Sequence, residues 1–369
     1  MRERELSVAV IGGGRWARAL SVVLAHNQLD AKGRIGRVMQ YRQHSESSIA
    51  KSAQSGRLSR DRLSGIKAPK NNQGDDETVQ MSASALLDAA GEVYAEQIEL
   101  AELIEADLLV LAVQARSVRA LLRGARRFLR ADQLLVHSIG SFAPNEVDRE
   151  ATGALISDVI QEETPIRRVG ALSGPALAED LEEWSPAALV CGCVSEEVAD
   201  AVRSVMVCPT LRVYKSRDLV GVEVARATVC IVALAAGVAE ALEFGASARA
   251  MLVARGAAEM SQIGLVLGGN DRTFLGLAGV GELVVATERR GSADFQLGQL
   301  LGRGVPLAEA QRQISRVCDA PVMIREAYLI AQRFGLRVPI TSYLYAWISG
   351  RTDLRSGLEH LFEDEAYLE

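Results

Sequence analysis

The stretch VAVIGGGRWARAL, residues 8–20, places three consecutive glycines between an apolar run and a segment with helical spacing. The run LSVAVI is rich in β-branched residues and uncharged, so we predict a short buried strand that ends at the glycines. A helix with a broad apolar face is expected from about Gly14 to Asn27. This order of strand, glycine turn and helix restricts the N-terminal part to a fold built from strand–helix units.

Gly12, Gly14 and Ala17 fit the pattern G-x-G-x-x-G/A, which indicates a dinucleotide-binding turn when it lies between a strand and a helix. The first glycine permits the tight turn, the second lets the backbone approach the pyrophosphate, and the small third residue lets helix and strand pack closely. The N–H groups at the start of the helix attract phosphate. The alternative is a glycine turn without a ligand, which any strand–helix unit can contain.

A second strand is predicted over GRVMQYR, and the residues at its end bear on the choice of cofactor. An Asp or Glu at this point would bind the ribose hydroxyls of NAD, but Arg42 stands here. Arginine suits a 2′-phosphate, so we expect NADP(H) or NAD(H), with a weak preference for NADP(H). The alternative is a solvated arginine in an arginine-rich chain.

The remaining elements alternate between strand and helix and then become helical throughout. We expect further strands in ADLLVLAVQ, QLLVHSIGS, AALVCGCV and TLRVYKS, with helices over about 117–129 and 196–206. This alternation predicts an α/β domain with a parallel, doubly wound sheet over residues 1–214, including a mobile polar insertion at 44–80. Residues 215–369 are expected to form an all-helical domain.

Composition narrows the class of protein. The chain has 369 residues, enough for two domains, and its net charge of -6 argues against a general nucleic-acid surface. We find no continuous apolar run near the roughly 18 residues that cross a bilayer and no secretory signal, so we expect a soluble, cytoplasmic protein. Five scattered cysteines suit reduced thiols, and no Cys or His spacing indicates a metal site.

Across nearly the whole chain the sequence resembles the NAD(P)-dependent glycerol-3-phosphate dehydrogenases. Six segments keep that family's order and spacing: VIGGGRWARAL, LSGPALAED, RVYKSRDLVGVEVA, ARAMLVARGAAEM, TFLGLAGVGELV and FGLRVPI. The resemblance implies a Rossmann domain followed by a helical domain of the 6-phosphogluconate dehydrogenase-like type, and a homodimer. It also implies reversible hydride transfer between NAD(P)H and dihydroxyacetone phosphate.

The residues that carry catalysis in this family are replaced by others in this chain. Ile139 stands in place of one lysine, and Val229 and Cys230 stand in place of the catalytic Lys-Asn pair. From residue 216 to the end there is no lysine. Loss of a proton donor typically costs about 100- to 10,000-fold in rate, so we expect the family reaction to be weak, altered or lost.

Other family positions differ in charge or size. Glu282 replaces an Asp and is a candidate catalytic residue. Ala286 replaces a Thr, Ala293 and Asp294 replace an Arg-Asn pair that contacts phosphate, and Ala176 replaces a Ser that contacts substrate. His137 lies two residues before Ile139 and is a candidate replacement acid, although an ordinary half-buried strand residue is the alternative. Arg289 and Arg290 could approach the phosphate position, or could form a solvated loop.

The positions that would contact the cofactor match the family better than the catalytic and phosphate-binding positions do. The resemblance assigns cofactor contacts to Gly12, Gly14, Arg15, Trp16, Ala178, Val317 and Asp319, beside the Arg42 inferred from its place after the second strand, and substrate contacts to Gly140 and Gly174. Among these, Arg15 replaces a small residue and could either clasp or crowd the pyrophosphate.

Three hypotheses follow. The first is an active oxidoreductase, acting on glycerol 3-phosphate or on a different carbonyl compound through a replacement acid. The second is a cofactor-binding pseudoenzyme that serves as a sensor, a scaffold or the partner of another protein. The third keeps only the fold, with Arg15 crowding the site too much for any dinucleotide.

Overall fold

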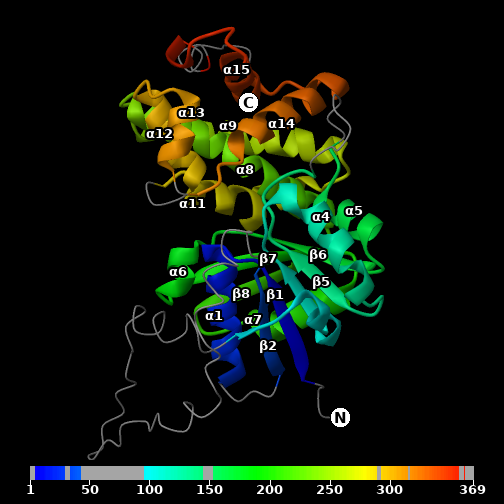
Figure 1. Ribbon diagram of the computed structural model, residues 1–369. Helices are drawn as coiled ribbons and strands as arrows, with labels where there is room; N and C mark the ends of the chain where they lie inside the picture. Colours follow the sequence, from blue (N-terminus) through cyan, green and yellow to red (C-terminus); the bar gives the residue numbers. More distant parts are fainter. Residues whose placement is uncertain are drawn as a thin grey trace, which may run out of the picture.

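The computed structural model describes residues 5–29, 34–42, 95–143, 153–288, 292–314, 316–356 and 361. A sheet domain carries the N-terminal part of the chain and a cluster of helices the C-terminal part (Figure 1). The change from strands to helices falls between residues 216 and 219. The insertion predicted at 44–80, and both Arg289 and Arg290, lie outside the described residues.

Within the described residues, eight strands form one sheet in the order β3-β2-β1-β4-β5-β6-β7-β8. Neighbouring strands are parallel except for β6 and β7, which are antiparallel. The strands are β1 (Leu6–Ile11), β2 (Ile35–Tyr41), β3 (Glu96–Gln97), β4 (Leu108–Leu111), β5 (Leu134–His137), β6 (Arg168–Ser173), β7 (Ala187–Cys193) and β8 (Leu211–Ser216).

The antiparallel pair corrects the prediction of a wholly parallel sheet. The only helix between β6 and β7 is α6 (Ala178–Glu182), whose five residues span about 7.5 Å at 1.5 Å per residue. A seven-residue strand such as β7 is about 23 Å long. Because α6 cannot carry the chain back along the sheet, β7 starts at the end where β6 finishes.

Helices cover both faces of the sheet, as the alternating pattern predicts. Val8 and Val10 of β1 pack in the same apolar cluster as α1 (Arg15–Leu29) and α7 (Glu196–Met206). Ala9 and Ile11 pack in the cluster of α4 (Ala115–Ala125) and α5 (Ile156–Glu163) on the opposite face. Short 3-10 helices, η2 (Leu100–Glu105) and η3 (Arg126–Phe128), complete this domain. The doubly wound α/β prediction is confirmed.

The helical domain is built around α8 (Leu219–Ala241), which lies among the other helices (Figure 1). The backbones of α8 and α12 (Ala293–Gly302) approach closely where the two helices cross, because Gly237 and Gly298 have no Cβ atom and one would clash there. The other elements are α9 (Ala246–Val266), α10 (Asp271–Leu275), the π-helix η4 (Leu277–Gly281), α11 (Glu282–Ala286), α12 (Ala293–Gly302), α13 (Leu307–Gln313), α14 (Ala320–Phe334) and α15 (Pro339–Ile348).

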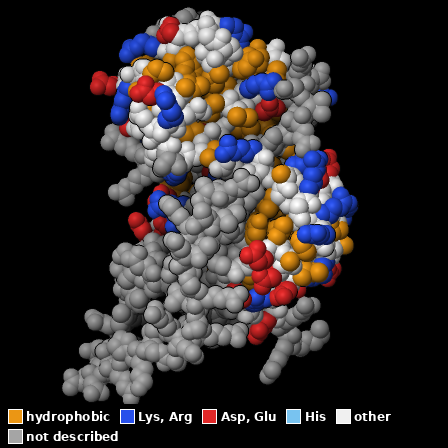
Figure 2. All heavy atoms as spheres, viewed as in Figure 1, with side chains coloured by type: hydrophobic (Ala, Val, Ile, Leu, Met, Phe, Trp, Pro, Cys, Tyr) orange, Lys and Arg blue, Asp and Glu red, His pale blue; other side chains and the backbone are white. Residues whose placement is uncertain are grey.

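Helix α8 passes a test of length and composition for a bilayer-crossing helix, although the sequence contains no continuous apolar run of that length. It has 23 residues and a mean hydropathy of 2.0 in its most apolar window, and it is the one such helix in the described part of the chain. Counting continuous apolar runs misses it because Glu223 and Arg226 interrupt the run. The window is 83% buried inside the protein, as in the core helix of a helical domain. Apolar side chains also appear on the visible face of this domain (Figure 2).

The five cysteines are free thiols, as expected. Cys191 and Cys193 are buried in β7, which confirms that AALVCGCV is a core strand. No group of three metal-binding side chains comes together within the described ranges.

Glu259 of α9 gives the helical domain a dependence on pH. Its carboxylate is 4% exposed and accepts hydrogen bonds from the backbone N–H groups of Ile340 and Thr341, at 2.5 and 3.1 Å, and from the Thr341 hydroxyl. Burial raises the pKa of Glu259 from its ordinary value of 4.5 to about 7. Between about pH 4.5 and 7, Glu259 is therefore protonated in the native state and ionised in the unfolded chain.

We expect the Glu259 contribution to stability to be complete below pH 4.5 and to disappear as the pH rises through about 7. At about 1.4 kcal/mol per pKa unit, the loss is on the order of 3 kcal/mol. Urea unfolding between pH 5 and 8 measures it. Glu259→Gln is the control, because its amide does not titrate: a variant as dependent on pH as the native protein in this range would contradict the assignment.

Candidate functional site

The carboxyl ends of β1 and β4 form the topological switch point of the sheet, where open α/β folds bind their ligands. The glycine turn follows β1 at this point. Gly12 has φ +155°, and a Cβ atom on it would lie 2.2 Å from the Ala112 carbonyl oxygen after β4. Gly14 has no other group within 4 Å of its would-be Cβ, so the space above it is open. The turn is closed on the protein side and open where a pyrophosphate would lie.

Arg42 lies beside this turn at the end of β2. Its side-chain carbons are 3.8–4.0 Å from the would-be Cβ of Gly13, and its Nη2 donates to Gln40 Oε1 at 3.0 Å. Its Nε is buried without a hydrogen-bond partner among the described residues. A buried donor without a partner is costly, so the site has a donor ready for an oxygen at this point. This position suits a ribose hydroxyl or a 2′-phosphate.

Arg15 and Trp16 begin α1 and tie the glycine turn to neighbouring elements. Arg15 Nε donates to Glu182 Oε2 at 3.0 Å and its Nη1 pairs with Glu179, both on α6. The Glu182 carboxylate raises the pKa of Arg15 above its usual value. Trp16 Nε1 donates to Ser138 Oγ at 2.8 Å, just beyond β5. Arg15 thus links the start of α1 to α6. Of the remaining cofactor candidates, Ala178 and Asp319 are half-buried and Val317 is exposed.

A further charged side chain, Arg226, lies at the ends of β5 and β6 and is not among the residues predicted from the sequence. It projects from α8 toward the end of β5, because its backbone oxygen and its Nε lie 3.3 and 3.4 Å from the would-be Cβ of Gly140. A side chain at position 140 would press against Arg226, which would have to shift by a few tenths of an ångström. The one available signal in the sequence is a charge within GVEVARATVC, a segment that is otherwise apolar apart from Glu223 and Thr228. Arg226 lies one helical turn before Val229, which stands in the family's lysine position.

Glu282 holds Arg226 in place. The Glu282 side chain is 5% exposed, and one of its oxygens pairs with Arg226 Nη1. The other accepts from the Gly174 N–H at 2.9 Å and from the Ser173 hydroxyl, so Glu282 is anchored to the end of β6. About a third of the Arg226 side chain is exposed, at 34%. A guanidinium is thereby fixed over the adjacent ends of β5 and β6.

Two further carboxylates act on this guanidinium. Desolvation lowers the pKa of Arg226, and the charges of Asp319 and Asp294 oppose that effect. Asp294 is 6% exposed, and its Oδ1 accepts from the Ala320 N–H at 2.9 Å. Burial raises the pKa of Asp294 to about 7, and burial also raises the pKa of Asp319. The site therefore combines one fixed cation with carboxyl groups in a poorly solvated setting.

His137 is buried at the end of β5, 1% exposed, and belongs to a polar cluster between the two domains. Its Nε2 lies 3.1 Å from Glu223 Oε1 of α8, without the geometry of a hydrogen bond. Glu223 accepts from the Ser157 N–H at 3.0 Å and from the Ser157 hydroxyl. The role of His137 as replacement acid stays a prediction.

The replaced family positions are buried. Each is exposed by 8% or less of its surface: Ile139, Val229, Cys230, Ala286, Ala293 and Asp294. Ile139 packs in the α4–α5 cluster of the sheet domain, and Val229 packs in the core of the helical domain. Gly140 and Gly174 flank the Arg226–Glu282 pair at the strand ends. Apolar side chains therefore stand where the family resemblance implies lysines.

Family models match both parts of the chain. The N-terminal model of NAD-dependent glycerol-3-phosphate dehydrogenase matches residues 91–199, and the C-terminal model matches residues 218–359. A glycerol-3-phosphate dehydrogenase [NAD(P)+] of Desulfitobacterium hafniense is 34% identical over 257 residues, 70% of this chain and 71% of that protein. This chain belongs to the NAD-dependent glycerol-3-phosphate dehydrogenase family.

Other members of the family align with this chain over most of its length. A glycerol-3-phosphate dehydrogenase [NAD(P)+] of Bacillus licheniformis is 28% identical over 361 residues, 96% of this chain and 93% of that protein. The crystal structure of glycerol-3-phosphate dehydrogenase from Coxiella burnetii superposes with a TM-score of 0.77 at 23% identity, covering 97% of this chain and 99% of that one. That likeness supports the fold assignment.

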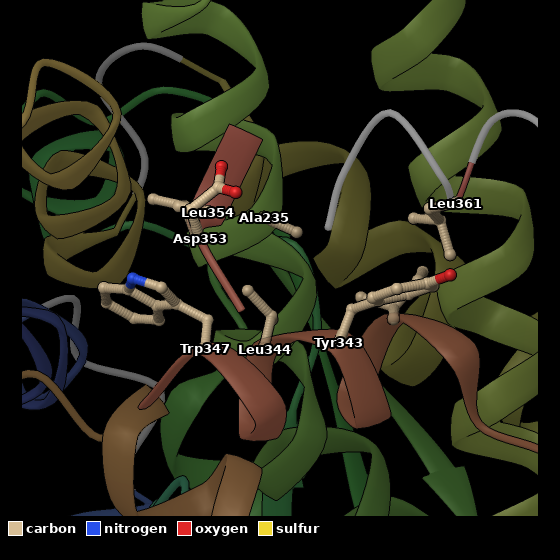
Figure 3. Close-up of a pocket in the computed structure, with 8 residues that line it drawn as sticks. Ala235, Tyr343, Leu344, Trp347, Asp353, Leu354 and Leu361 are labelled. Atoms are coloured by element: carbon tan, nitrogen blue, oxygen red, sulfur yellow. The ribbon is translucent and has the colours of Figure 1, made fainter. Parts of the chain in front are cut away.

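A separate cavity lies inside the helical domain, away from the strand ends (Figure 3). Tyr343, Leu344 and Trp347 of α15 line it together with Ala235 of α8 and Leu361. Its volume is about 10 Å³, which is about the space of one water molecule. It is a packing gap, too small for a substrate.

Proposed function

We propose that this chain is an NAD(P)-dependent oxidoreductase in which the family reaction, between sn-glycerol 3-phosphate and dihydroxyacetone phosphate, is weak, altered or lost. The observation that carries the proposal is the Arg226–Glu282 pair over the ends of β5 and β6, with Asp294 acting on the same guanidinium. A phosphate dianion is bound by cations and N–H donors, and a reducible carbonyl needs a proton donor. Arg226 is a strong hydrogen-bond donor but a poor acid.

The glycine turn after β1 supports dinucleotide binding. Gly12, the open space above Gly14 and the first N–H groups of α1 would hold the pyrophosphate, and Arg42 would contact the ribose or its 2′-phosphate. A bound nicotinamide supplies or accepts the hydride. The protein's part is to position the substrate carbonyl, to stabilise charge on its oxygen and to keep water away.

The proposal is tested by fluorescence titration with NADPH and NADH, followed by addition of dihydroxyacetone phosphate while absorbance is monitored. We expect cofactor binding and slow oxidation or none. Rapid oxidation would contradict a weakened family reaction and would make His137→Ala the next variant. Absence of binding to either nucleotide would overturn the proposal and leave the fold alone.

Gly14→Val is expected to lower affinity for both nucleotides by about tenfold or more, because a branched side chain would fill the space above the turn. The melting temperature should stay within about 2 °C, since no protein atom lies within 4 Å of the added Cβ. Gly245→Val is the matched control, at another helix start with equally open surroundings. Unchanged affinity in Gly14→Val would place the pyrophosphate elsewhere.

Arg42 underlies the proposed preference for NADP(H). Arg42→Ala removes a charged hydrogen-bond donor, so we expect affinity for NADPH to fall by about tenfold and affinity for NADH to change much less. Arg37→Ala on the same strand is the control, because Arg37 pairs with Glu96 and Glu105 at the surface. Equal losses for the two nucleotides would argue against a contact with the 2′-phosphate.

The second candidate function is a non-catalytic cofactor-binding protein, a pseudoenzyme that acts as a sensor, a scaffold or the partner of another protein. Apolar Ile139 and Val229 at the family's lysine positions favour it. Binding without oxidation of NADPH by any carbonyl compound would support it. We also propose a cytoplasmic homodimer, and light scattering after size-exclusion chromatography tests the dimer.

A further inference from the structure

The buried side chain of Gln40 joins two parts of the proposed dinucleotide site. Gln40 lies on β2, is 2% exposed, and its Nε2 donates to the Gly12 carbonyl oxygen at 3.1 Å. Its Oε1 accepts from Arg42 Nη2 at 3.0 Å and from Gln97 Nε2 of β3 at 3.2 Å. One amide group therefore contacts both the glycine turn after β1 and the arginine at the end of β2.

The partners of this amide determine which way it faces. A guanidinium can only donate hydrogen bonds, and a backbone carbonyl oxygen can only accept them. The amide oxygen of Gln40 must therefore face Arg42, and the amide nitrogen must face Gly12. Gln97 donates to the same oxygen, so both of its lone pairs are used. The orientation of the Gln40 amide is thus fixed at both of its ends.

The backbone at this point is held as well as the side chain. The Gly12 N–H donates to the Tyr41 carbonyl oxygen at 2.9 Å, and the Ile98 N–H donates to the Gln40 carbonyl oxygen at 3.1 Å. Gln40 also pairs with Gln97 in the parallel ladder of β2 and β3. Both polar backbone groups of Gly12 are therefore bonded to β2, one through the backbone and the other through Gln40.

Position 40 requires a side chain that both donates and accepts. Glutamate would offer no donor to the Gly12 carbonyl oxygen, and methionine would offer no acceptor to Arg42. A glutamate carboxylate would also lie beside the guanidinium and offset its attraction for a phosphate. The neutral amide of Gln40 orients Arg42 and leaves its positive charge for a ligand.

On the basis of the proposed function, we infer that Gln40 is a positioning residue that sets the discrimination between NADP(H) and NAD(H). Through Gln40, the separation between the glycine turn and the Arg42 guanidinium is fixed before a ligand binds, so less conformational entropy is lost on binding. A dinucleotide with a 2′-phosphate gains from this arrangement, because its pyrophosphate and its 2′-phosphate are held at a set separation. NAD(H) lacks the second phosphate and gains little from the position of Arg42.

The experiment measures the dissociation constants of NADPH and NADH in Gln40→Met. We expect affinity for NADPH to fall by about fivefold more than affinity for NADH, because Arg42 loses its acceptor. An unchanged ratio of the two constants, with both nucleotides bound, overturns the inference and leaves the proposed function standing. If the native protein binds neither nucleotide, the proposed function fails and the inference fails with it.

A double-mutant cycle separates positioning from a general structural effect. If Gln40 acts through Arg42, then Gln40→Met should change the ratio by less than about twofold in the Arg42→Ala background. A change there as large as in the native background would show that the two residues act independently, which would contradict the inference.

Gln133→Met is the matched control. Gln133 precedes β5, is 0% exposed, and its Nε2 donates to the carbonyl oxygens of Leu103 and Ala106 at 2.7 and 2.8 Å. Loss of this second buried amide should lower the melting temperature as Gln40→Met does, without changing the ratio of the two constants. An equal shift of the ratio in both variants would assign the effect to lost stability and contradict a role for Gln40.

Gln40→Glu keeps the inference testable if Gln40→Met does not fold. Glutamate has nearly the shape of glutamine and keeps an acceptor for Arg42 and Gln97, but it adds a negative charge. Affinity for NADPH should again fall by about fivefold more than affinity for NADH, because the charge opposes the 2′-phosphate. Equal losses for the two nucleotides would overturn the inference.

Discussion

Replacement of Gly237 by alanine is expected to destabilise the protein by about 3 kcal/mol or more, although it adds a single methyl group. The added Cβ would lie 2.0 Å from the Phe295 carbonyl oxygen and 2.9 Å from its carbon, so α12 would have to move away from α8. Gly298 makes the reciprocal contact, with its would-be Cβ 2.1 Å from the Leu234 carbonyl oxygen. Backbone in a packed helix pair yields less easily than a side chain.

Gly124→Ala in α4 is the matched control for Gly237→Ala. It is also a helical glycine, but its added Cβ would come no closer than 4.0 Å to Leu100. Alanine is a better helix former than glycine by about 0.8–1.0 kcal/mol, so this variant should be neutral or stabilising. Urea unfolding of both variants measures the contrast. Similar free energies of unfolding for the two would show that α8 and α12 are less closely packed than described.

Glu223→Ala is expected to cost about 3–5 kcal/mol, because it breaks a buried polar cluster at the junction of the two domains. The substitution would leave the Ser157 N–H and hydroxyl without their acceptor, and His137 without its charged neighbour. Glu223 is 4% exposed, so water cannot replace the lost contacts without reorganisation.

The matched control is Glu197→Ala on α7. Glu197 pairs with Arg168 but is 65% exposed, and surface pairs of this kind contribute about 0–1 kcal/mol. Thermal and urea unfolding should therefore separate the two alanine variants clearly. If Glu223→Ala loses less than about 1 kcal/mol, the buried cluster does not stabilise the junction. Glu223→Gln should lie between, since it keeps one acceptor oxygen.

Local patterns predicted most of the elements. The strands at LSVAVI and AALVCGCV and the helix at 196–206 lie where alternation and helical spacing placed them. The strand β6 (Arg168–Ser173) was not predicted, and with it the antiparallel pairing to β7 was missed. Strand direction depends on how the chain crosses the sheet, which no local pattern records.

The candidate site was predicted unevenly. The glycine turn was found because its chemistry is contained in six consecutive positions. Arg226 was missed because its importance depends on Glu282, Asp294 and Asp319, which come from distant segments. His137 was singled out as a strand residue near the site, and only the structure shows that Glu223 of α8 lies against it.

The sequence by itself determined the glycine turn, the alternation of elements, the family and the loss of the lysines, because each depends on residue identity or on spacing along the chain. The tertiary structure decided the direction of β7, the burial of α8 and the pairing of Arg226 with Glu282. These features depend on contacts between segments far apart in sequence, since packing and desolvation act through space.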